Sequence, residues 1–197
     1  MGYTFSMQTH ATGRFAHPAL NTDALGIHEG MVVADFGVGS GQYALHIAER
    51  VGRSGVVYAI DVQQPLLVRL KNESHRKGLD TIHIVWGDVT RVGGSKIADG
   101  VVDRVLISNL LFQLEEPIQA LKEARRILKP AGQLALIDWS DAPPSSGRRW
   151  GPHTSHRIKK DQALVLARKA HFESVREFNA GAHHYGLIFR PAPKTAL

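Results

Sequence analysis

Residues 31–42 read MVVADFGVGSGQ, an apolar run that leads directly into three glycines at alternate positions. The run 31–36 is almost wholly apolar, which is typical of a strand buried on both faces of a parallel sheet. Apolar residues at helical spacing then predict a helix over 42–51. Glycines in such a turn let the backbone bend sharply beside a ligand, and the helix start directs free N–H groups towards it. The stretch therefore predicts a strand–turn–helix unit with a ligand site at the turn.

The same alternation of strands and helices continues along the chain. Strands are predicted over 56–60, 81–86, 101–107 and 134–139, and helices over 65–77 and 117–128. Pro65 suits a first helical turn and Gly78 a helix end. Alternating strands and helices are the signature of a mainly parallel α/β sheet. A further helix is predicted before the sheet, around 18–25.

The pattern changes after residue 140. Residues 141–152 are rich in proline, serine and glycine, which predicts a loop. After a helix over 160–170, two strands over 174–179 and 184–190 are joined by only four residues. Such a short connection predicts an antiparallel hairpin. We expect a parallel core of five strands with an antiparallel terminal strand.

Three aspartates fall at the ends of predicted strands. Asp35 immediately precedes the glycine-rich turn, Asp61 ends the second strand and Asp88 follows the third. Asp61 lies 61 − 41 = 20 residues after Gly41, the spacing expected of a carboxylate that binds ribose hydroxyls. Open α/β sheets bind their ligands at these strand ends. The three carboxylates therefore predict one nucleoside site.

Two kinds of ligand suit this site. A dinucleotide fingerprint has a third glycine where this chain has Gln42. The negative charge of Asp35 would oppose a pyrophosphate but attract a sulfonium or amino group. The pattern favours a cationic adenosyl ligand. An NAD(P)-dependent oxidoreductase remains the alternative, because the spacing from Gly41 to Asp61 suits a dinucleotide as well.

Composition excludes several classes of protein. The 197 residues fit one domain, and the absence of cysteine rules out disulfides, thiolate metal sites and cysteine nucleophiles. No apolar stretch is long enough to span a membrane, and residues 1–17 lack the pattern of a secretory signal, so we expect a cytoplasmic protein. A net charge of +6 favours anionic partners such as RNA.

The segments VVADFGVGSGQYALHIAERVG (32–52), IVWGDV (84–89) and LKPAGQLALID (128–138) resemble the successive motifs of class I methyltransferases. The chain is most similar to the small quinone-biosynthesis C-methyltransferases and arsenite methyltransferases, over about residues 30–190. The resemblance implies a Rossmann-like, seven-stranded, mostly parallel sheet with an antiparallel last strand and helices on both faces. It implies S-adenosylmethionine as the cofactor of a domain over 31–197. Residues 1–30 are expected to form a lid over the site.

The resemblance also assigns roles to individual residues. It implies that the glycine turn binds the methionine part of the cofactor, that the next two strand ends bind ribose and adenine, and that the fourth faces the methyl group. The residues concerned are Asp35, Gly37, Gly39, Gly41, Asp61, Val62, Asp88, Val89, Ser108 and Asn109. The chain departs from arsenite methyltransferases in lacking cysteine, which puts arsenic chemistry in doubt. It also has SNLL at 108–111, where amino-group nucleobase methylases have an N-P-P-[YF] run.

The sequence does not identify the methyl acceptor. Methyl transfer needs no metal, and it needs a general base only when a proton must leave the acceptor. The candidate catalytic residues are Asn109, Asp138 and His153, although Asp138 is equally suited to capping a turn and His153 to an inert place in a loop. His153, His156, His183 and His184 match no zinc spacing, so no metal is expected.

A small-molecule acceptor is the leading expectation. The alternative is an RNA or protein methyltransferase that uses the basic region 148–160. Arginine and lysine there could contact phosphates, and a tryptophan could stack on bases. The residues concerned are Arg148, Arg149, Trp150, Arg157, Lys159 and Lys160. A solvated loop and helix start explains the same charges.

Overall fold

The computed structural model describes residues 18–140 and 152–193. Its centre is a seven-stranded sheet of order β3-β2-β1-β4-β5-β7-β6. The strands are β1 (Val32–Phe36), β2 (Val56–Asp61), β3 (Ile82–Trp86), β4 (Val102–Ser108), β5 (Leu128–Trp139), β6 (Phe172–Asn179) and β7 (His184–Pro191). β1 to β5 pair in parallel, whereas β7 runs antiparallel to both of its neighbours. The sequence-based prediction of a mainly parallel sheet with a reversed last strand is confirmed.

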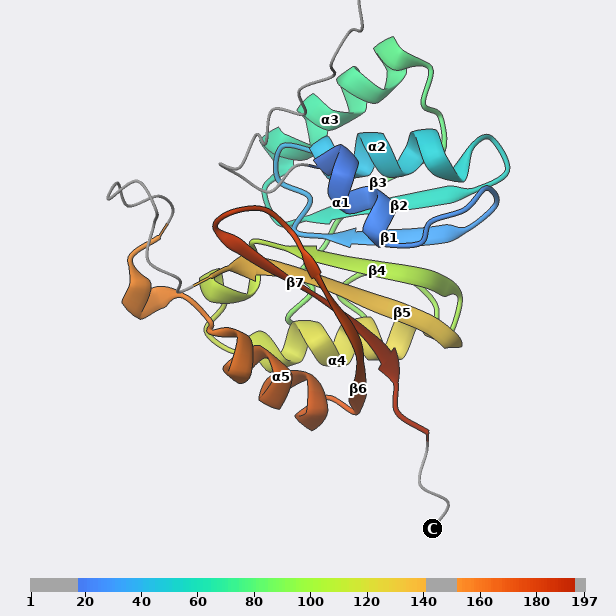
Figure 1. Cartoon of the computed structure of the whole chain (residues 1–197). Helices are drawn as coiled ribbons and strands as arrows, with labels where there is room; N and C mark the ends of the chain where they lie inside the picture. Colours follow the sequence, from blue (N-terminus) through green and yellow to red (C-terminus); the bar gives the residue numbers. More distant parts are fainter. Residues whose placement is uncertain (1–17, 141–151, 194–197) are drawn as a thin grey trace, which may run out of the picture.

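Helices cover both faces of this sheet (Figure 1). They are α1 (Pro18–Ala24), α2 (Gln42–Val51), α3 (Gln64–Lys77), α4 (Pro117–Ile127) and α5 (Lys160–Lys169), with short 3₁₀ turns η1 (Leu111–Gln113) and η2 (Thr154–His156). The first three lie on one face, here called the α2 face, and α4 and α5 lie on the other, the α4 face.

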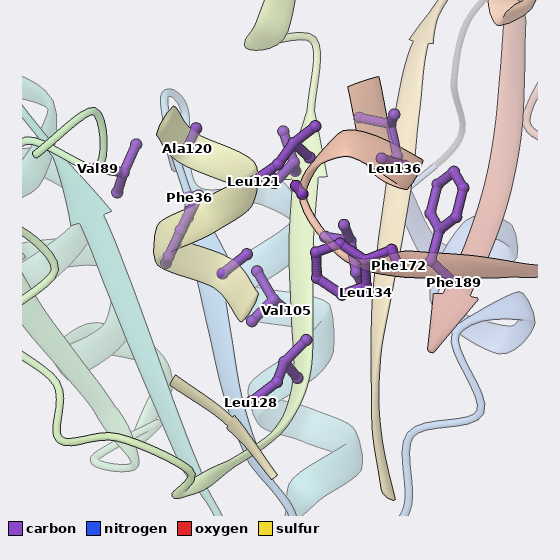
Figure 2. Close-up of a cluster of buried hydrophobic side chains, with 14 of the residues drawn as sticks. Phe36, Val89, Val105, Ala120, Leu121, Leu128, Leu134, Leu136, Phe172 and Phe189 are labelled. Atoms are coloured by element: carbon purple, nitrogen blue, oxygen red, sulfur yellow. The ribbon is translucent and has the colours of Figure 1, made fainter. Parts of the chain in front are cut away.

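Alternate residues of each strand supply the two cores, as the pleat of a strand requires. Val33 of β1 and Leu106 of β4 pack on the α2 face. Phe36 of β1 packs on the α4 face, where Leu121 of α4 and Phe189 of β7 belong to the same cluster (Figure 2). Each of these large side chains is almost fully buried, which stabilises the fold by roughly 1.5–3 kcal/mol per side chain. This alternation also fixes which face each residue at a strand end occupies.

β5 is longer than the sequence predicted. The helix before it ends at Ile127, and β5 begins at Leu128 rather than at Leu134. Leu128 pairs with Val102 of β4, whereas Gln133 pairs with Arg104, so the register shifts at this point. Residues 129–132 of β5 lie opposite Asp103 alone, so β5 has (133 − 128) − (104 − 102) = 3 extra residues at this point. This irregularity accommodates Pro130, which lacks the N–H that a regular ladder needs.

The parallel strands end level with one another. Phe36 pairs with Ile60 and with Ile107, and each of these strands ends within one residue of that point. Ser108 in turn pairs with Ile137, close to the end of β5. We call this border, together with the start of β7, the carboxyl edge of the sheet. It is the border at which open α/β sheets bind ligands.

A buried carboxylate orders the chain between β3 and β4. Glu123 of α4 is 2% exposed and accepts hydrogen bonds from the backbone N–H groups of Gly93 and Ser95, from the Ser95 hydroxyl and from Arg126. Although burial opposes ionisation, these donors lower the pKa of Glu123 to about 2. The segment that follows Asp88 is thereby held against α4. Within residues 18–140 and 152–193, no helix is long and apolar enough to cross a membrane.

Candidate functional site

The glycine turn between β1 and α2 adopts left-handed backbone conformations that favour glycine. The φ angles are +68° at Gly37, +53° at Gly39 and +80° at Gly41. A Cβ on Gly41 would lie 2.5 Å from the Leu70 side chain, whereas a Cβ on Gly39 would meet nothing closer than 3.8 Å. Packing within the protein therefore explains Gly41, and Gly39 borders open space. Gly41 precedes α2 without a side-chain cap, which leaves the helix start to an incoming group.

Asp61 is bound to this turn. Its Oδ2 accepts the Gly39 N–H at 2.9 Å, and its Oδ1 accepts the Gln63 N–H at 2.9 Å. The side chain is 7% exposed. Because an ionised carboxylate has about four acceptor positions, two remain for a ligand. Asp61 therefore orders the turn and keeps the capacity to accept ribose hydroxyls.

Asp35 lies beneath the same turn, close enough to Asp61 for the two charges to interact. It is 2% exposed, and its Oδ2 is a buried atom without a hydrogen-bond partner. Burial first, and then the charge of Asp61, raise the pKa of Asp35 to about 8. The carboxyl group is therefore largely protonated at neutral pH until a positive charge approaches it. This refines the expectation of a permanent negative charge at this position.

Two residues that sequence reasoning missed connect this region to the N-terminal helix. Tyr43, in the first turn of α2, lies beside Ser108 at the end of β4, and the Ser108 side chain opposes the rise that burial causes in the pKa of Tyr43. The Asn21 amide of α1 donates to the Tyr43 hydroxyl at 2.8 Å and to the Ala180 carbonyl at 3.1 Å. Asn21 is 3% exposed. A tyrosine next to the glycine turn was visible in the sequence, but the docking of α1 was not.

Asp88 is placed differently from the other two aspartates. Its carboxylate accepts hydrogen bonds from the Thr90 hydroxyl and backbone N–H and from Arg91, and these bonds lower its pKa. Only the backbone connects it to Asp61, through the Gly87 N–H at 3.2 Å from the Asp61 carbonyl. Of the three predicted aspartates, Asp35 and Asp61 therefore form a close pair. Asp88 lies apart from them, after the end of the neighbouring strand β3.

The residues expected beside adenine differ in exposure. Val89 is 6% exposed and packs in the core of the α4 face, so its backbone rather than its side chain is available to a ligand. Val62 is 58% exposed, and its carbonyl accepts the Trp86 indole N–H at 3.1 Å. Trp86 is 57% exposed, with the Lys96 ammonium 5.8 Å from its ring centre. An aromatic surface therefore borders the predicted adenine position.

A backbone hydrogen bond connects the ends of β4 and β5. Asn109 has a φ of +53°, its N–H donates to the Ile137 carbonyl, and its Oδ1 is buried without a partner. Asp138 is fully buried, its Oδ1 accepts the Trp139 backbone N–H at 2.8 Å, and its Oδ2 has no hydrogen-bond partner. Burial raises the pKa of Asp138 to about 7, although the backbone N–H groups of Trp139, Leu111 and Phe112 act in the opposite direction. Asp138 therefore lies near the start of the turn η1 that follows Asn109.

His184 is the first residue of β7 and lies at the carboxyl edge of the sheet. It pairs with Trp139 of β5, and the two rings contact each other with their centres 4.3 Å apart and their planes tilted by 39°. The side chain is 7% exposed, and neither ring nitrogen has a hydrogen-bond partner. Burial, and then the charges of His183 and Arg157, lower the pKa of His184 to about 4. Nothing in the sequence distinguishes His184 from His183.

The other predicted features are exposed, make contacts of their own within the protein, or lie outside the described residues. His153 is exposed, and its Nδ1 contacts the Ser155 hydroxyl at 2.8 Å. Arg157 donates to the carbonyls of Ser140 and Pro152, and Lys160 forms an ion pair with Glu177. The segments 1–17 and 141–151, which include Arg148, Arg149 and Trp150, are not among the described residues. The described residues contain no group of three or more histidine or acidic side chains able to hold a metal.

Unpartnered buried polar atoms gather at the carboxyl edge. Such atoms are rare in proteins and call for an explanation wherever they occur. Among the side chains of residues 18–140 and 152–193, they belong to Asp35, Asn109, Asp138 and His184. These residues lie at the ends of β1, β4 and β5 and at the start of β7. The location of Asp35, Asn109 and His184 indicates a ligand site at this edge of a Rossmann-like sheet, whereas Asp138 lies on the α4 face.

Comparisons with known proteins agree with this class. Residues 34–136 match the model of the methyltransferase domain family, which is more than half of the chain. The chain belongs to the methyltransferase domain family. S-adenosylmethionine is the cofactor that membership of this family implies. The match favours an adenosyl sulfonium over the dinucleotide that the glycine spacing had left open.

Individual relatives support the same assignment. The chain is 32% identical over 153 residues to a ubiquinone/menaquinone biosynthesis C-methyltransferase of Hydrogenovibrio crunogenus, covering 77% of this chain and 59% of the relative. It is 32% identical over 115 residues to an arsenite methyltransferase of Aquipseudomonas alcaligenes, covering 56% and 33%. A SAM-dependent methyltransferase from Aquifex aeolicus superposes with a TM-score of 0.79 at 26% identity, covering 89% of both chains. The chain spans about half the length of the curated relatives it matches.

Proposed function

We propose that the protein transfers the methyl group of S-adenosylmethionine to a small-molecule acceptor. The observation that carries this proposal is the gathering of buried, unpartnered polar atoms at the carboxyl edge, beside an uncapped helix start. A preference for a small molecule is supported by the relatives, which are named for quinone biosynthesis and for arsenite.

The residues at the edge fit this cofactor. The buried Oδ2 of Asp35 lacks a partner, which suits a cationic group, and the two free acceptor positions of Asp61 suit ribose hydroxyls. Asp88, Val89 and Val62 would border adenine, with Val89 acting through its backbone. Ser108, which lies beside Tyr43, would face the methyl group. When bound, the cofactor supplies a methyl group on a sulfonium that leaves as a neutral thioether.

The protein's contribution to the reaction is largely positional. Holding two reactants in line can lower a barrier by roughly 7–11 kcal/mol without a metal or a covalent intermediate. Asn109 is suited to this task because its strained backbone and buried Oδ1 lie at the end of β4. Asp138 is better suited to positioning η1 than to contacting an acceptor, since its carboxylate is buried among backbone donors.

The RNA and protein alternatives have less support. The described members of the basic region are engaged within the protein, Arg157 with carbonyl groups and Lys160 with Glu177. No contact of the described residues favours a polymer as the acceptor.

Thermal unfolding with S-adenosylhomocysteine tests the cofactor. A ligand at 100 times its Kd stabilises the folded state by about 2.7 kcal/mol, which raises the Tm of a chain of this size by roughly 5–10 °C. NADH is the matched control and should leave the Tm unchanged. Labelled methyl groups from S-adenosylmethionine should then enter the small-molecule fraction of a cell extract. A shift with NADH alone, or label confined to RNA or protein, would contradict the proposal.

We also propose that residues 1–30 form a lid over the bound cofactor. Support comes from Asn21, which joins α1 to Tyr43 at the glycine turn and to Ala180 at the β6–β7 connection. Asn21→Ala removes one buried and one partly buried hydrogen bond and should lower the free energy of unfolding by about 2 kcal/mol.

If α1 belongs to a lid, Asn21→Ala should also weaken S-adenosylhomocysteine binding by several fold. Denaturant unfolding and calorimetric titration measure the two effects. Leu20→Ala, which truncates a side chain that is 63% exposed on the same helix, is the control. Unchanged affinity in a destabilised Asn21→Ala protein would show that α1 only stabilises the fold.

A further inference from the structure

His184 lies on the same face of the sheet as the residues proposed to hold the cofactor. Ser108 pairs with Ile137, and both belong to the α2 face, as does Asp35 two residues after Val33. Trp139 follows Ile137 by two residues and pairs with His184. Because directly paired residues share a face, His184 and Trp139 continue the row that begins at Asp35.

The His184 ring is built into this position without a partner of its own. The residue is 7% exposed, its ring contacts the tilted Trp139 ring, and both of its ring nitrogens lack a hydrogen-bond partner. Leaving a buried polar group unsatisfied costs about 1–3 kcal/mol. A ligand group that hydrogen-bonds to the ring would recover this free energy.

The charges around the ring restrict the chemistry of that group. The Arg157 guanidinium lies 5.4 Å from the centre of the Trp139 ring, and Arg157 and His183 both disfavour a second positive charge at His184. This field opposes a cationic ammonium and suits a neutral hydroxyl group. A hydroxyl oxygen becomes a strong acid while it is being methylated, so it can give its proton even to a ring of low pKa. The ring is neutral at pH 7, because its pKa is lowered to about 4, and only the neutral ring accepts a proton.

The other candidate bases are less well placed. Asp138 pairs with Tyr185, whose side chain packs in the core of the α4 face, so Asp138 points away from the row that contains Ser108. His153 is exposed and contacts Ser155. Among the described residues of that row, His184 is the base nearest to Trp139 at the end of β5.

We propose that His184 binds an acidic hydroxyl of the methyl acceptor, such as a phenol, and takes its proton during methyl transfer. This inference rests on the proposed function. The acceptor oxygen forms a bond to the methyl carbon, the sulfur retains the electron pair of the bond that breaks, and the hydroxyl proton moves to a His184 ring nitrogen. The resulting imidazolium then loses this proton to water, which restores the neutral ring.

Calorimetric titration with 4-nitrophenol tests this role on the full chain saturated with S-adenosylhomocysteine. We expect saturable binding by the wild type and a loss of at least about tenfold in affinity for His184→Phe, corresponding to about 1.4 kcal/mol. His183→Phe is the matched control and should bind within about twofold of the wild type. Both variants should keep the Tm shift with S-adenosylhomocysteine, which shows that they are folded and bind the cofactor product.

Turnover with S-adenosylmethionine at about pH 6, where 4-nitrophenol is mainly un-ionised and still has a proton to lose, separates proton transfer from binding. Mass spectrometry should detect 4-nitroanisole from the wild type and from His183→Phe. His184→Gln, which retains hydrogen-bonding groups but cannot take the proton, should bind 4-nitrophenol and form no ether. Absence of binding by a wild type that shows the Tm shift, equal binding by His184→Phe, or ether formation by His184→Gln would overturn the inference. Absence of the Tm shift itself would instead overturn the proposed function.

Discussion

Asp35→Asn is expected to weaken S-adenosylmethionine binding about 100-fold at pH 8 and to abolish its pH dependence. A hydrogen bond to a charged group contributes about 1.5–3 kcal/mol, and tenfold in affinity corresponds to about 1.4 kcal/mol. In the wild type, burial and Asp61 raise the pKa of Asp35 to about 8, so binding a cation requires a proton to leave. Wild-type affinity should therefore rise by up to about tenfold per pH unit between pH 6 and 8.

A rise in pH strengthens cofactor binding through Asp35, but it lowers the stability of the ligand-free protein through the same carboxyl group. Asp35 keeps its proton up to about pH 8 when folded, whereas the unfolded chain loses it near the ordinary value of 3.8. Between these values the unfolded state binds fewer protons, so the contribution of Asp35 to the free energy of unfolding falls as the pH rises. Asp35→Asn should thus raise the ligand-free Tm above that of the wild type at pH 8, by a few degrees.

Calorimetric titration at pH 6, 7 and 8 and thermal unfolding at the same values measure both effects. Asp80→Asn, which changes an exposed acid, is the control and should alter neither. Wild-type affinity that is constant over this range, or Asp35→Asn binding that equals the wild type at pH 8, would remove Asp35 from the cofactor site.

Local signals in the sequence predicted most of the parallel half of the fold. α2 was predicted with its exact bounds because glycines precede and follow it, and β1 differs by a single residue. The start of β5 was missed because Pro130 and Gly132 usually end regular structure, and here a register shift with β4 accommodates them. That shift depends on the neighbouring strand, which a reading of local propensity cannot include.

The candidate site likewise contains residues that local sequence signals predict and residues that they do not. Asp35 and Asp61 could be predicted because their signal is a position next to a strand end. His184 and Asn21 could not, because their places depend on contacts between distant segments. The hairpin of β6 and β7 was visible in the sequence, but the insertion of β7 beside β5, which brings His184 to Trp139, was not.

Asp61→Ala is expected to have the largest effect on cofactor binding, a loss of at least about 100-fold. Truncating one partner of a buried, charge-assisted contact costs about 2–5 kcal/mol. Here the carboxylate also accepts the N–H groups of Gly39 and Gln63, so its removal loosens the glycine turn as well as the ribose site. Gln63→Ala, which changes an exposed side chain and keeps the backbone donor, is the matched control.

Comparing two nucleosides separates the ribose contact from the loosened turn. Wild-type protein should bind adenosine at least about tenfold more tightly than 2′,3′-dideoxyadenosine, because each hydroxyl can donate to the free acceptor positions of Asp61. Asp61→Ala should bind the two nucleosides equally. If Asp61 contacts the ribose hydroxyls, removing these hydroxyls has no further effect once the carboxylate is gone, as in a double-mutant cycle. If the variant keeps the wild-type preference while binding both more weakly, Asp61 only orders the turn, and another group must hold the ribose.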